Sequence, residues 1–329
     1  MTAPASVAAS VLDIADLSVS FQTPERKRLK VLDGVTLHIG EGEVLGVVGE
    51  SGSGKSVTAL SVLRLLGEQG AIDTGRISLA GQELTRLPEA AMLKIRGRHA
   101  AMIFQEPMTS LNPVYTVGFQ IMEVLVEHLG VSSEEARRRA IELMQRVGIP
   151  SPERRVDDYP HQLSGGMRQR VMIAIALACS PKLLIADEPT TALDVTIQAQ
   201  ILALMRKLRD ETGAAILMIT HDLGVIAQMA DRVVVMYAGQ VVEEGIVGEL
   251  FARPLHPYTR LLMRSIPLAR KKLKRLEAIA GTTPSPASFP QGCRFNPRCP
   301  EADDRCRTEP QVLRRFADGR QARCWRVEA

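Results

Sequence analysis

One glycine-rich stretch of the chain has the residue types and the spacing that bind phosphate groups. It matches the pattern G-x-x-x-x-G-K-[ST] with the residues Gly49, Glu50, Ser51, Gly52, Ser53, Gly54, Lys55 and Ser56. Glycines allow a tight turn whose N–H groups converge on phosphate oxygens, and a following helix adds the positive end of its dipole. We expect Lys55 to reach the β- and γ-phosphates and the Ser56 hydroxyl to bind Mg²⁺, with Val57 beginning the helix. The stretch therefore predicts a nucleotide-binding site.

Two adjacent carboxylates, Asp187 and Glu188, follow an apolar run over 183–186. Such a run predicts a buried parallel strand with the acids at its C-terminal end, where α/β proteins bind ligands. Asp187 suits the coordination of Mg²⁺ through water, and Glu188 suits a general base that polarises the attacking water. The alternative is that both acids are ordinary surface charges, and the apolar run before them argues against it.

Other polar residues follow predicted strands or precede a helix. Gln105 follows the apolar run 100–104, where it could contact a metal-bound water. His221 follows 214–220, where it could contact a γ-phosphate or the base that orients water. Taken singly, a Gln is more often a surface residue and a His is more often structural. The Ser-Gly-Gly sequence within 163–166 directly precedes an expected helix, and it forms a second candidate anion site.

Apolar periodicity predicts the elements that must position these side chains. The expected strands are 11–21, 31–39, 44–48, 75–80, 100–104, 183–186 and 214–220, with a closing hairpin over 233–242. The expected helices are 57–66, 116–129, 171–179 and 195–211, and one from a Ser132–Glu135 capping box to about Gly148. Strands that alternate with helices indicate an α/β fold, and the mostly helical stretch of about 106–180 indicates an insertion between core strands.

Length and composition restrict the classes of protein to which this chain can belong. The 329 residues suffice for a full α/β domain and a smaller one, and 45% hydrophobic and 24% charged residues are ordinary for a globular chain. The longest apolar run, 171–179, has nine residues, whereas a membrane span needs about 18. The N-terminus has no basic region followed by an apolar core, so we expect no signal peptide. These features predict a cytoplasmic protein unless a partner holds it at a membrane.

Charge is distributed unevenly along the chain. The formal net charge is +4, but residues 253–329 contain 17 Lys and Arg against 7 Asp and Glu, a local +10 that leaves −6 for the rest. Such asymmetry suggests a tail that faces an acidic partner, a lipid headgroup surface or nucleic acid. A solvated basic face is the alternative.

Four of the five cysteines lie in this tail, whereas Cys179 lies in an apolar helix and is expected in the core. The tail cysteines are Cys293, Cys299, Cys306 and Cys324, spaced C-x5-C-x6-C-x17-C. In a cytosolic protein this clustering favours metal binding over disulfides, and the lack of C-x2-C pairs argues against an ordinary zinc ribbon. We favour a [4Fe–4S] cluster, with zinc or unligated thiols as alternatives. Six nearby arginines would offset a cluster's negative charge: Arg294, Arg298, Arg305, Arg307, Arg323 and Arg326.

Together these motifs resemble those of one family, the ATP-binding cassette (ABC) ATPases, over about residues 11–250. The motifs that carry the resemblance are the phosphate loop, Gln105, Leu163-Ser164-Gly165-Gly166, Asp187-Glu188, Asp194 and His221. The resemblance implies an α/β P-loop NTPase fold with a RecA-like core, an antiparallel β edge subdomain and a helical subdomain. It implies ATP and Mg²⁺ as ligands, with Ser56, Gln105 and Asp187 around the metal. It also makes Phe21 similar to the aromatic residue that stacks on adenine.

The resemblance implies a role for each of the other site residues. Glu188 is similar to the catalytic base, and His221 is similar to the switch histidine. Gln105 is similar to the glutamine that senses Mg²⁺ and the transmembrane partner. Residues 163–166 are similar to the signature that closes on the γ-phosphate of the opposite subunit, and Asp194 lies in the loop that communicates across the dimer.

Several stretches resemble the oligopeptide/dipeptide importer branch of this family. They are 105–113, 163–170 with Met167 where the commonest signature has Gln, 190–200, and 256–260 at the start of that branch's C-terminal extension. The resemblance implies an ATPase that energises the import of di- or oligopeptides, or of nickel or another small solute. It implies two transmembrane permease subunits, a second and often paralogous ATPase chain in a head-to-tail dimer, and an extracytoplasmic solute-binding protein. The implied location is peripheral, on the cytoplasmic face of the inner membrane.

The expected domains are an ATPase domain over 1–250, with its helical subdomain at about 106–180, and a C-terminal extension over 251–329 with the four-cysteine tail. The longer tails of the branch also suggest the [4Fe–4S] cluster. A rival interpretation is a soluble cassette ATPase that acts on nucleic acid through its basic tail. The aromatic residues of the tail show no stacking pattern, so we expect no nucleic-acid partner.

Overall fold

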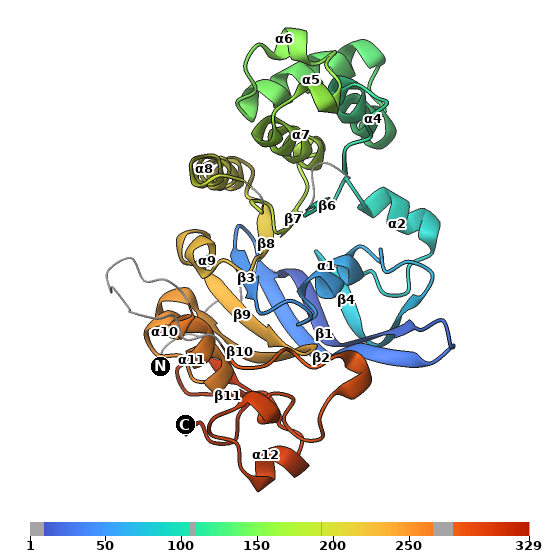
Figure 1. Ribbon diagram of the computed structural model, residues 1–329. Coiled ribbons are helices and arrows are strands. Elements are labelled where there is room, and N and C mark those ends of the chain that lie inside the picture. The colour runs from blue at the N-terminus through green and yellow to red at the C-terminus, as the bar shows by residue number, and fades with distance from the viewer. Residues whose placement is uncertain (1–9, 106–109, 192, 266–278, 329) are drawn as a thin grey trace, which may run out of the picture. The chain divides into compact units, whose positions relative to one another are not determined.

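The computed structural model describes residues 10–105, 110–191, 193–265 and 279–328 (Figure 1). These residues form two compact units. The first contains Ile39–Glu43 and Arg86–Met218 with the start of the chain up to Val11, and the second contains Leu12–His38, Val44–Thr85 and Ile219–Ala329. None of the described helices has the length and apolar character that a membrane crossing needs.

A four-stranded sheet in the second unit is built from the first strands of the chain. Its order is β2 (Arg28–Gly40), β1 (Ser10–Gln22), β4 (Gly70–Leu79) and β5 (Gln82–Glu83). Apolar residues of β1 meet apolar residues of β4 in antiparallel register: Leu12 lies opposite Leu79, and Ile14 lies opposite Ile77. All four are buried, as the alternation of apolar residues in β1 predicts.

A second group of strands in the same unit leads into the phosphate loop. Its order is β3 (Val44–Val48), β9 (Arg232–Tyr237), β10 (Gln240–Ile246), β12 (Gln321–Ala322) and β11 (Arg314–Arg315). β3 and β9 are parallel, and every residue of β3 is buried, which explains its unbroken apolar run. β9 and β10 form the hairpin expected over 233–242. β12 pairs antiparallel with β10, and no sequence pattern predicts this strand.

The second unit also contains short helices. They are α1 (Lys55–Val62), α9 (Leu223–Met229), α10 (Val247–Ala252), α11 (Pro257–Arg264) and α12 (Asp304–Thr308). α1 is shorter than the predicted 57–66, and Arg64 adopts a left-handed φ of 53° just after its end. α9 packs closely on β3, because a Cβ at Gly46 would lie 2.6 Å from Ile226 Cδ1. Helix α9 begins shortly after His221 in the sequence. Its contact with Gly46 places it on β3, the strand before the phosphate loop.

The first unit contains three further strands. They are β8 (Ala215–Ile219), β7 (Leu183–Asp187) and β6 (Ala100–Ile103), in that order. β6 and β7 are parallel, with Ile103 opposite Ala186, so their C-terminal ends lie at the same edge. Gln105 and Glu188 each follow one of these ends.

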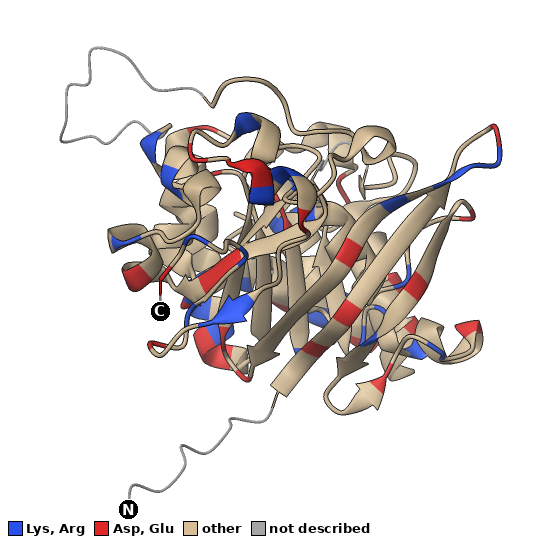
Figure 2. Cartoon of the chain, turned by 90° about the horizontal axis from the view of Figure 1, so that it is seen from below, with Lys and Arg blue, Asp and Glu red and all other residues tan. Residues whose placement is uncertain are grey.

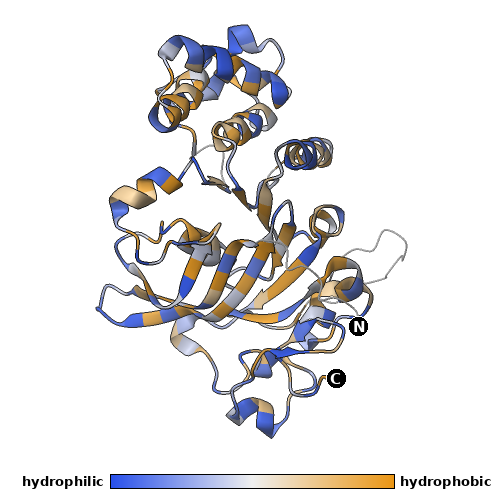
Figure 3. Ribbon diagram, turned by 180° about the vertical axis from the view of Figure 1, so that it is seen from behind, coloured by the Kyte–Doolittle hydropathy of each residue, from blue (hydrophilic) through white to orange (hydrophobic). Residues whose placement is uncertain are grey.

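Between β6 and β7 the described chain is helical. The helices are α4 (Val117–Leu129), α5 (Ser133–Arg146), α6 (Pro152–Arg155) and α7 (Gly165–Leu177), with α2 (Glu89–Ile95) before β6 and α8 (Val195–Thr212) after β7. Thr116 and Ser132 cap α4 and α5 by accepting from the N–H groups of Phe119 and Glu135. In Figure 3 the group α4–α7 is hydrophilic on its outer side and hydrophobic where its helices meet. Residues 106–109 and 192 of the importer-like stretches 105–113 and 190–200 lie outside the described residues.

Candidate functional site

The phosphate loop joins β3 to α1, and close contacts require two of its glycines. Gly49 has a φ of 155°, and a Cβ there would lie 2.2 Å from the backbone oxygen of Met236. Gly54 has a φ of 100°, and a Cβ there would lie 2.6 Å from Leu32 Cδ2. A larger residue at either position would displace backbone or a buried leucine. The narrow loop therefore depends on glycine at both positions.

Lys55 is the first residue of α1, and its side chain turns back into the loop. The residue is 7% exposed, and its Nζ donates to the carbonyl oxygens of Gly49 at 2.8 Å and Glu50 at 3.0 Å. The other predicted loop residues differ in exposure: buried Ser53, partly buried Ser56 and Val57, and exposed Ser51 and Gly52. An ammonium group beside the first N–H groups of a helix is suited to binding a phosphate.

Phe21, the predicted adenine-stacking residue, lies at the end of β1 opposite Gly70 of β4. A Cβ at Gly70 would lie 2.9 Å from Phe21 Cε1, so the glycine leaves room for the ring. The side chain is partly exposed, and it belongs to the same unit as the phosphate loop. These features are compatible with stacking on a base.

The parallel strands β6 and β7 bring two predicted residues together. Gln105 Nε2 donates to Glu188 Oε2 at 2.8 Å, and Thr191 Oγ1 donates to the same oxygen at 2.9 Å. Asp187, the last residue of β7, is 5% exposed, whereas Glu188 adopts a left-handed φ of 49° after it. Two donors on one oxygen orient the carboxylate, as a general base requires. Thr191 is absent from the residues that the sequence singles out, because a threonine in a turn carries no distinctive pattern.

His221 belongs to the second unit and follows β8 at its C-terminal end. It is exposed, and the next residue, Asp222, caps α9 by accepting from the N–H of Gly224 at 2.7 Å. The N–H of Thr220 donates to Val47 O at 3.3 Å, so His221 follows a residue bonded to the strand before the phosphate loop. His221 belongs to the second unit, whereas Glu188 belongs to the first.

The predicted signature lies at the N-terminus of α7. This helix begins at Gly165, six residues before the predicted Val171, because Ser164 caps it by accepting from the N–H of Met167 at 3.3 Å. Leu163, just before the cap, is 3% exposed. The Ser-Gly-Gly sequence therefore forms the start of a helix of 13 residues, with its first N–H groups at the signature.

Asp194 lies in the same unit as the signature. It caps α8 by accepting from the N–H of Ile197 at 3.0 Å. A Cβ at Gly166 would lie 2.9 Å from Ile197 Cγ2, so the start of α7 approaches the start of α8 closely. Glycine at this position permits the contact between the signature and the first turn after Asp194.

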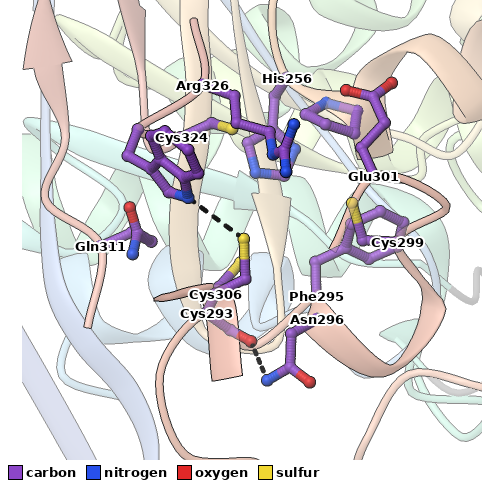
Figure 4. Close-up of a pocket in the computed structure, with 12 residues that line it drawn as sticks. His256, Cys293, Phe295, Asn296, Cys299, Glu301, Cys306, Gln311, Cys324 and Arg326 are labelled. Atoms are coloured by element: carbon purple, nitrogen blue, oxygen red, sulfur yellow. Dashed lines mark hydrogen bonds between the residues drawn. The ribbon is translucent and has the colours of Figure 1, made fainter. Parts of the chain in front are cut away.

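The four tail cysteines line one small pocket (Figure 4). Its volume is about 10 Å³, room for about one water molecule. Trp325 Nε1 donates to Cys306 Sγ at 3.3 Å. Burial raises the pKa of the Cys293 and Cys299 thiols to about 11. Burial also raises the pKa of the Cys324 thiol.

The donor set of this pocket suits a thiolate-bound metal centre, but the side chains as described are not placed as ligands. Within the described ranges, no three Cys, His, Asp or Glu side chains are arranged to hold a metal ion. Four cysteine thiols that line one pocket nevertheless have the chemistry of Fe–S or zinc ligands. Cys179, expected in the core, lies just beyond α7 and is only partly buried, with its Sγ 3.9 Å from Val124 O.

Five of the six arginines expected around the thiols pair with carboxylates instead, which corrects that expectation. The pairs are Arg294–Asp33, Arg298–Glu50, Arg305–Glu309, Arg307–Asp304 and Arg326–Asp303, at 2.6–2.8 Å. Arg323 donates to the backbone oxygens of Val241 and Gln311, and of the six arginines only Arg326 lines the pocket. Figure 2 shows acidic and basic segments side by side around the C-terminus. The charge of these five arginines is therefore already paired.

Two family models and several curated proteins match the sequence of this chain. Residues 32–191 match the family model described as ABC transporter, and residues 242–306 match that described as oligopeptide/dipeptide transporter, C-terminal region. The chain is 53% identical to the oligopeptide transport ATP-binding protein AppD of Bacillus subtilis over 97% of both chains. It is 50% identical to the dipeptide transport ATP-binding protein DppD of Escherichia coli over 96% of both chains.

A solved structure shows the same fold. It is a dimeric ATP-binding cassette in a post-hydrolysis state with ADP and Pi bound. It is 30% identical to this chain with a TM-score of 0.65, and the alignment covers 72% of this chain and 98% of that one. The similarity confirms the predicted P-loop NTPase fold. On these grounds the chain belongs to the ABC transporter ATP-binding family, with the C-terminal region of its oligopeptide/dipeptide members.

Proposed function

We propose that this chain hydrolyses ATP to energise the import of di- or oligopeptides through a membrane ABC transporter. The observation that carries the proposal is the similarity over nearly the whole length, tail included, to two proteins named for oligopeptide and dipeptide transport. Import of nickel or another small solute is the alternative cargo. A test is uptake of labelled peptides and of nickel by cells with and without this chain, in which peptide uptake alone should depend on it.

Each site residue has its own role in ATP hydrolysis. Lys55 and the first N–H groups of α1 bind the β- and γ-phosphates, and Phe21 stacks on the adenine. Mg²⁺, when bound, neutralises charge on the phosphates, and Ser56, Asp187 and Gln105 would hold it. Glu188, oriented by its contact with Gln105, accepts a proton from the attacking water. His221 orients the γ-phosphate or this base.

Partners complete the site in this proposal. A second ABC ATPase, often a paralogue, faces this chain head to tail, so that residues 163–166 and Asp194 of each chain serve the nucleotide bound to the other. The dimeric state of the similar cassette supports this arrangement. Two transmembrane permease subunits would hold the pair at the cytoplasmic face of the inner membrane, with a solute-binding protein on the other side. We propose the domain limits 1–250, with a helical subdomain at 106–180, and 251–329 for the tail.

Purification from membranes tests these partners. Affinity capture of the tagged full-length chain from detergent-solubilised membranes, followed by mass spectrometry, should recover two polytopic membrane proteins and a second cassette ATPase. Capture of nucleic acid or ribosomal proteins instead would contradict the transporter role and favour the rival nucleic-acid function. The carboxylate pairs of the tail arginines argue against that rival, since such arginines must lose a partner to bind phosphate.

The four-cysteine pocket supports a second proposal, a metal centre in the tail. Cys293, Cys299, Cys306 and Cys324 would hold a [4Fe–4S] cluster, with Zn²⁺ or unligated thiols as alternatives. Its support is that all four thiols line one pocket, in which Trp325 Nε1 donates to Cys306 Sγ, as groups around such centres donate to their ligands. The centre would cross-link distant parts of the tail, and no step of ATP hydrolysis depends on it.

Replacing two of these cysteines by Ser should remove the metal. For chain purified without oxygen, we expect about four iron atoms and four sulfides per parent chain. The double variant Cys306→Ser/Cys324→Ser should lose nearly all of both, whereas the control Cys179→Ser should retain them, because Cys179 lies outside the pocket. About one zinc per chain would favour the alternative metal, and metal-free parent protein would refute the centre.

A further inference from the structure

The cysteine-rich tail contacts the phosphate loop directly, through the second residue of that loop. We propose that Arg298 and Tyr258 are positioning residues for ATP binding, because together they hold Glu50 and thereby the resting shape of the phosphate loop. The inference rests on the proposed ATPase function. It assigns to the tail a part in nucleotide binding that is separate from any metal it holds.

The side chain of Glu50 is held by a fork of two hydrogen bonds. Arg298 Nη1 lies 2.6 Å from Glu50 Oε2, and Arg298 Nη2 lies 3.0 Å from Oε1. The Arg298 side chain is 6% exposed and that of Glu50 is 30% exposed, so the pair is largely shielded from water. Thr283 Oγ1 adds a bond to Oε2 at 3.3 Å. Paired, shielded contacts of this kind fix orientation more strongly than an exposed ion pair does.

The backbone of Glu50 is held at both of its polar groups. Its N–H donates to the Tyr258 hydroxyl at 2.9 Å. Its carbonyl oxygen accepts from Lys55 Nζ at 3.0 Å and from the N–H of Ser53 at 3.2 Å. The residue that the tail holds is therefore the same residue that holds the phosphate-binding lysine. A shift of Glu50 would move the resting position of the Lys55 ammonium and the loop N–H groups together.

A rigid aromatic cluster supports both tail residues. The rings of Tyr237, Tyr258 and Phe295 lie with centroids 4.7–5.3 Å apart and are at most 1% exposed. Arg298 Nη1 also donates to the Tyr237 hydroxyl at 3.3 Å, and its Nε donates to Ala280 O at 2.8 Å. Burial raises the pKa of Tyr258, so its hydroxyl stays neutral and keeps its proton. The fork and the hydroxyl are thus held by packing before any nucleotide arrives.

A purely structural role for the ion pair is the competing explanation, and kinetics separates the two. With the full-length chain assembled in its transporter complex, Arg298→Gln should raise KM for ATP by about tenfold or more and leave kcat within about threefold, because uniform nucleotide binding is lost. Tyr258→Phe should raise KM by about two- to tenfold, because only one hydroxyl is removed from an intact aromatic cluster. The matched control is Arg305→Gln, which breaks an exposed pair with Glu309 in the same tail and should leave KM unchanged.

A double-mutant cycle on Glu50 and Arg298 gives a second test of the two hydrogen bonds between them. Glu50→Gln should raise KM as Arg298→Gln does, and the two changes combined should cost little more than either alone, because they remove the same contact. Parental KM in both Arg298→Gln and Tyr258→Phe would overturn the inference, even if both variants unfold at lower temperature. If Arg298→Gln fails to fold, Tyr258→Phe decides the question. A parent transporter complex without ATPase activity would instead contradict the proposed function, so the two failures are distinguishable.

Discussion

Replacement of Glu188 by Gln is expected to lower ATP turnover by about 10²- to 10⁴-fold, the usual contribution of a general base. The amide cannot accept the proton of the attacking water. It keeps the size of the carboxylate and an oxygen that can accept from Gln105 and Thr191, which lie 2.8 and 2.9 Å from Glu188 Oε2. ATP binding should therefore persist. Because hydrolysis no longer resets the pair, the variant should accumulate as an ATP-bound dimer.

Two measurements check this expectation: phosphate release at saturating ATP, and size-exclusion chromatography with ATP and Mg²⁺. Glu211→Gln is a suitable control, since this exposed carboxylate of α8 pairs with Arg146 and should be dispensable for turnover. Hydrolysis by Glu188→Gln at the parental rate would show that another residue acts as the base. A variant that neither binds nor hydrolyses ATP would point to a folding defect, which thermal unfolding would reveal.

Replacement of Lys55 by Met is expected to weaken ATP binding by about 10- to 100-fold, the loss of a hydrogen bond to a charged group. The side chain is almost fully buried, and its ammonium is held in the loop by Gly49 O and Glu50 O. Met preserves the length of the buried stem and removes only the charge. Titration with a fluorescent ATP analogue in the presence of Mg²⁺ measures the change in Kd.

Lys207→Met is the matched control for this prediction. Lys207 lies on α8 with its side chain 66% exposed, 3.8 Å from Glu211 in an exposed ion pair. Its removal should leave Kd within about twofold, since exposed pairs contribute little. Equal affinities of Lys55→Met and the parent chain would mean that the lysine does not contact the phosphates.

Side chains that follow a strand end were predictable from sequence because their positions depend on near neighbours. The apolar run of β7 places Asp187 and Glu188 at its end, and the short run of β6 does the same for Gln105. Parallel pairing then brings Gln105 to Glu188. The glycine pattern of the phosphate loop is local for the same reason. Gly49 and Gly54 adopt the positive φ angles of this short loop, whereas their close contacts with Met236 and Leu32 come from distant parts of the chain.

The start of α7 shows where local patterns mislead. Glycines and polar residues over 165–170 lack the apolar period of a helix, so the helix was expected to begin at Val171. The Ser164 cap and the close approach of Gly166 to Ile197 extend it by six residues. Hydrogen bonds and packing outweigh the low helix propensity of glycine here.

The sequence by itself determined the fold class, the phosphate loop and the residues at the strand ends, because short-range periodicity and spacing encode them. Only the tertiary structure decided which residues the tail contacts. The pairing of β12 with β10, the carboxylate partners of the tail arginines and the contact of Arg298 with Glu50 join residues up to 261 positions apart. No local pattern encodes which acid meets which arginine across that separation, because the choice depends on how strands and loops pack once the chain has folded.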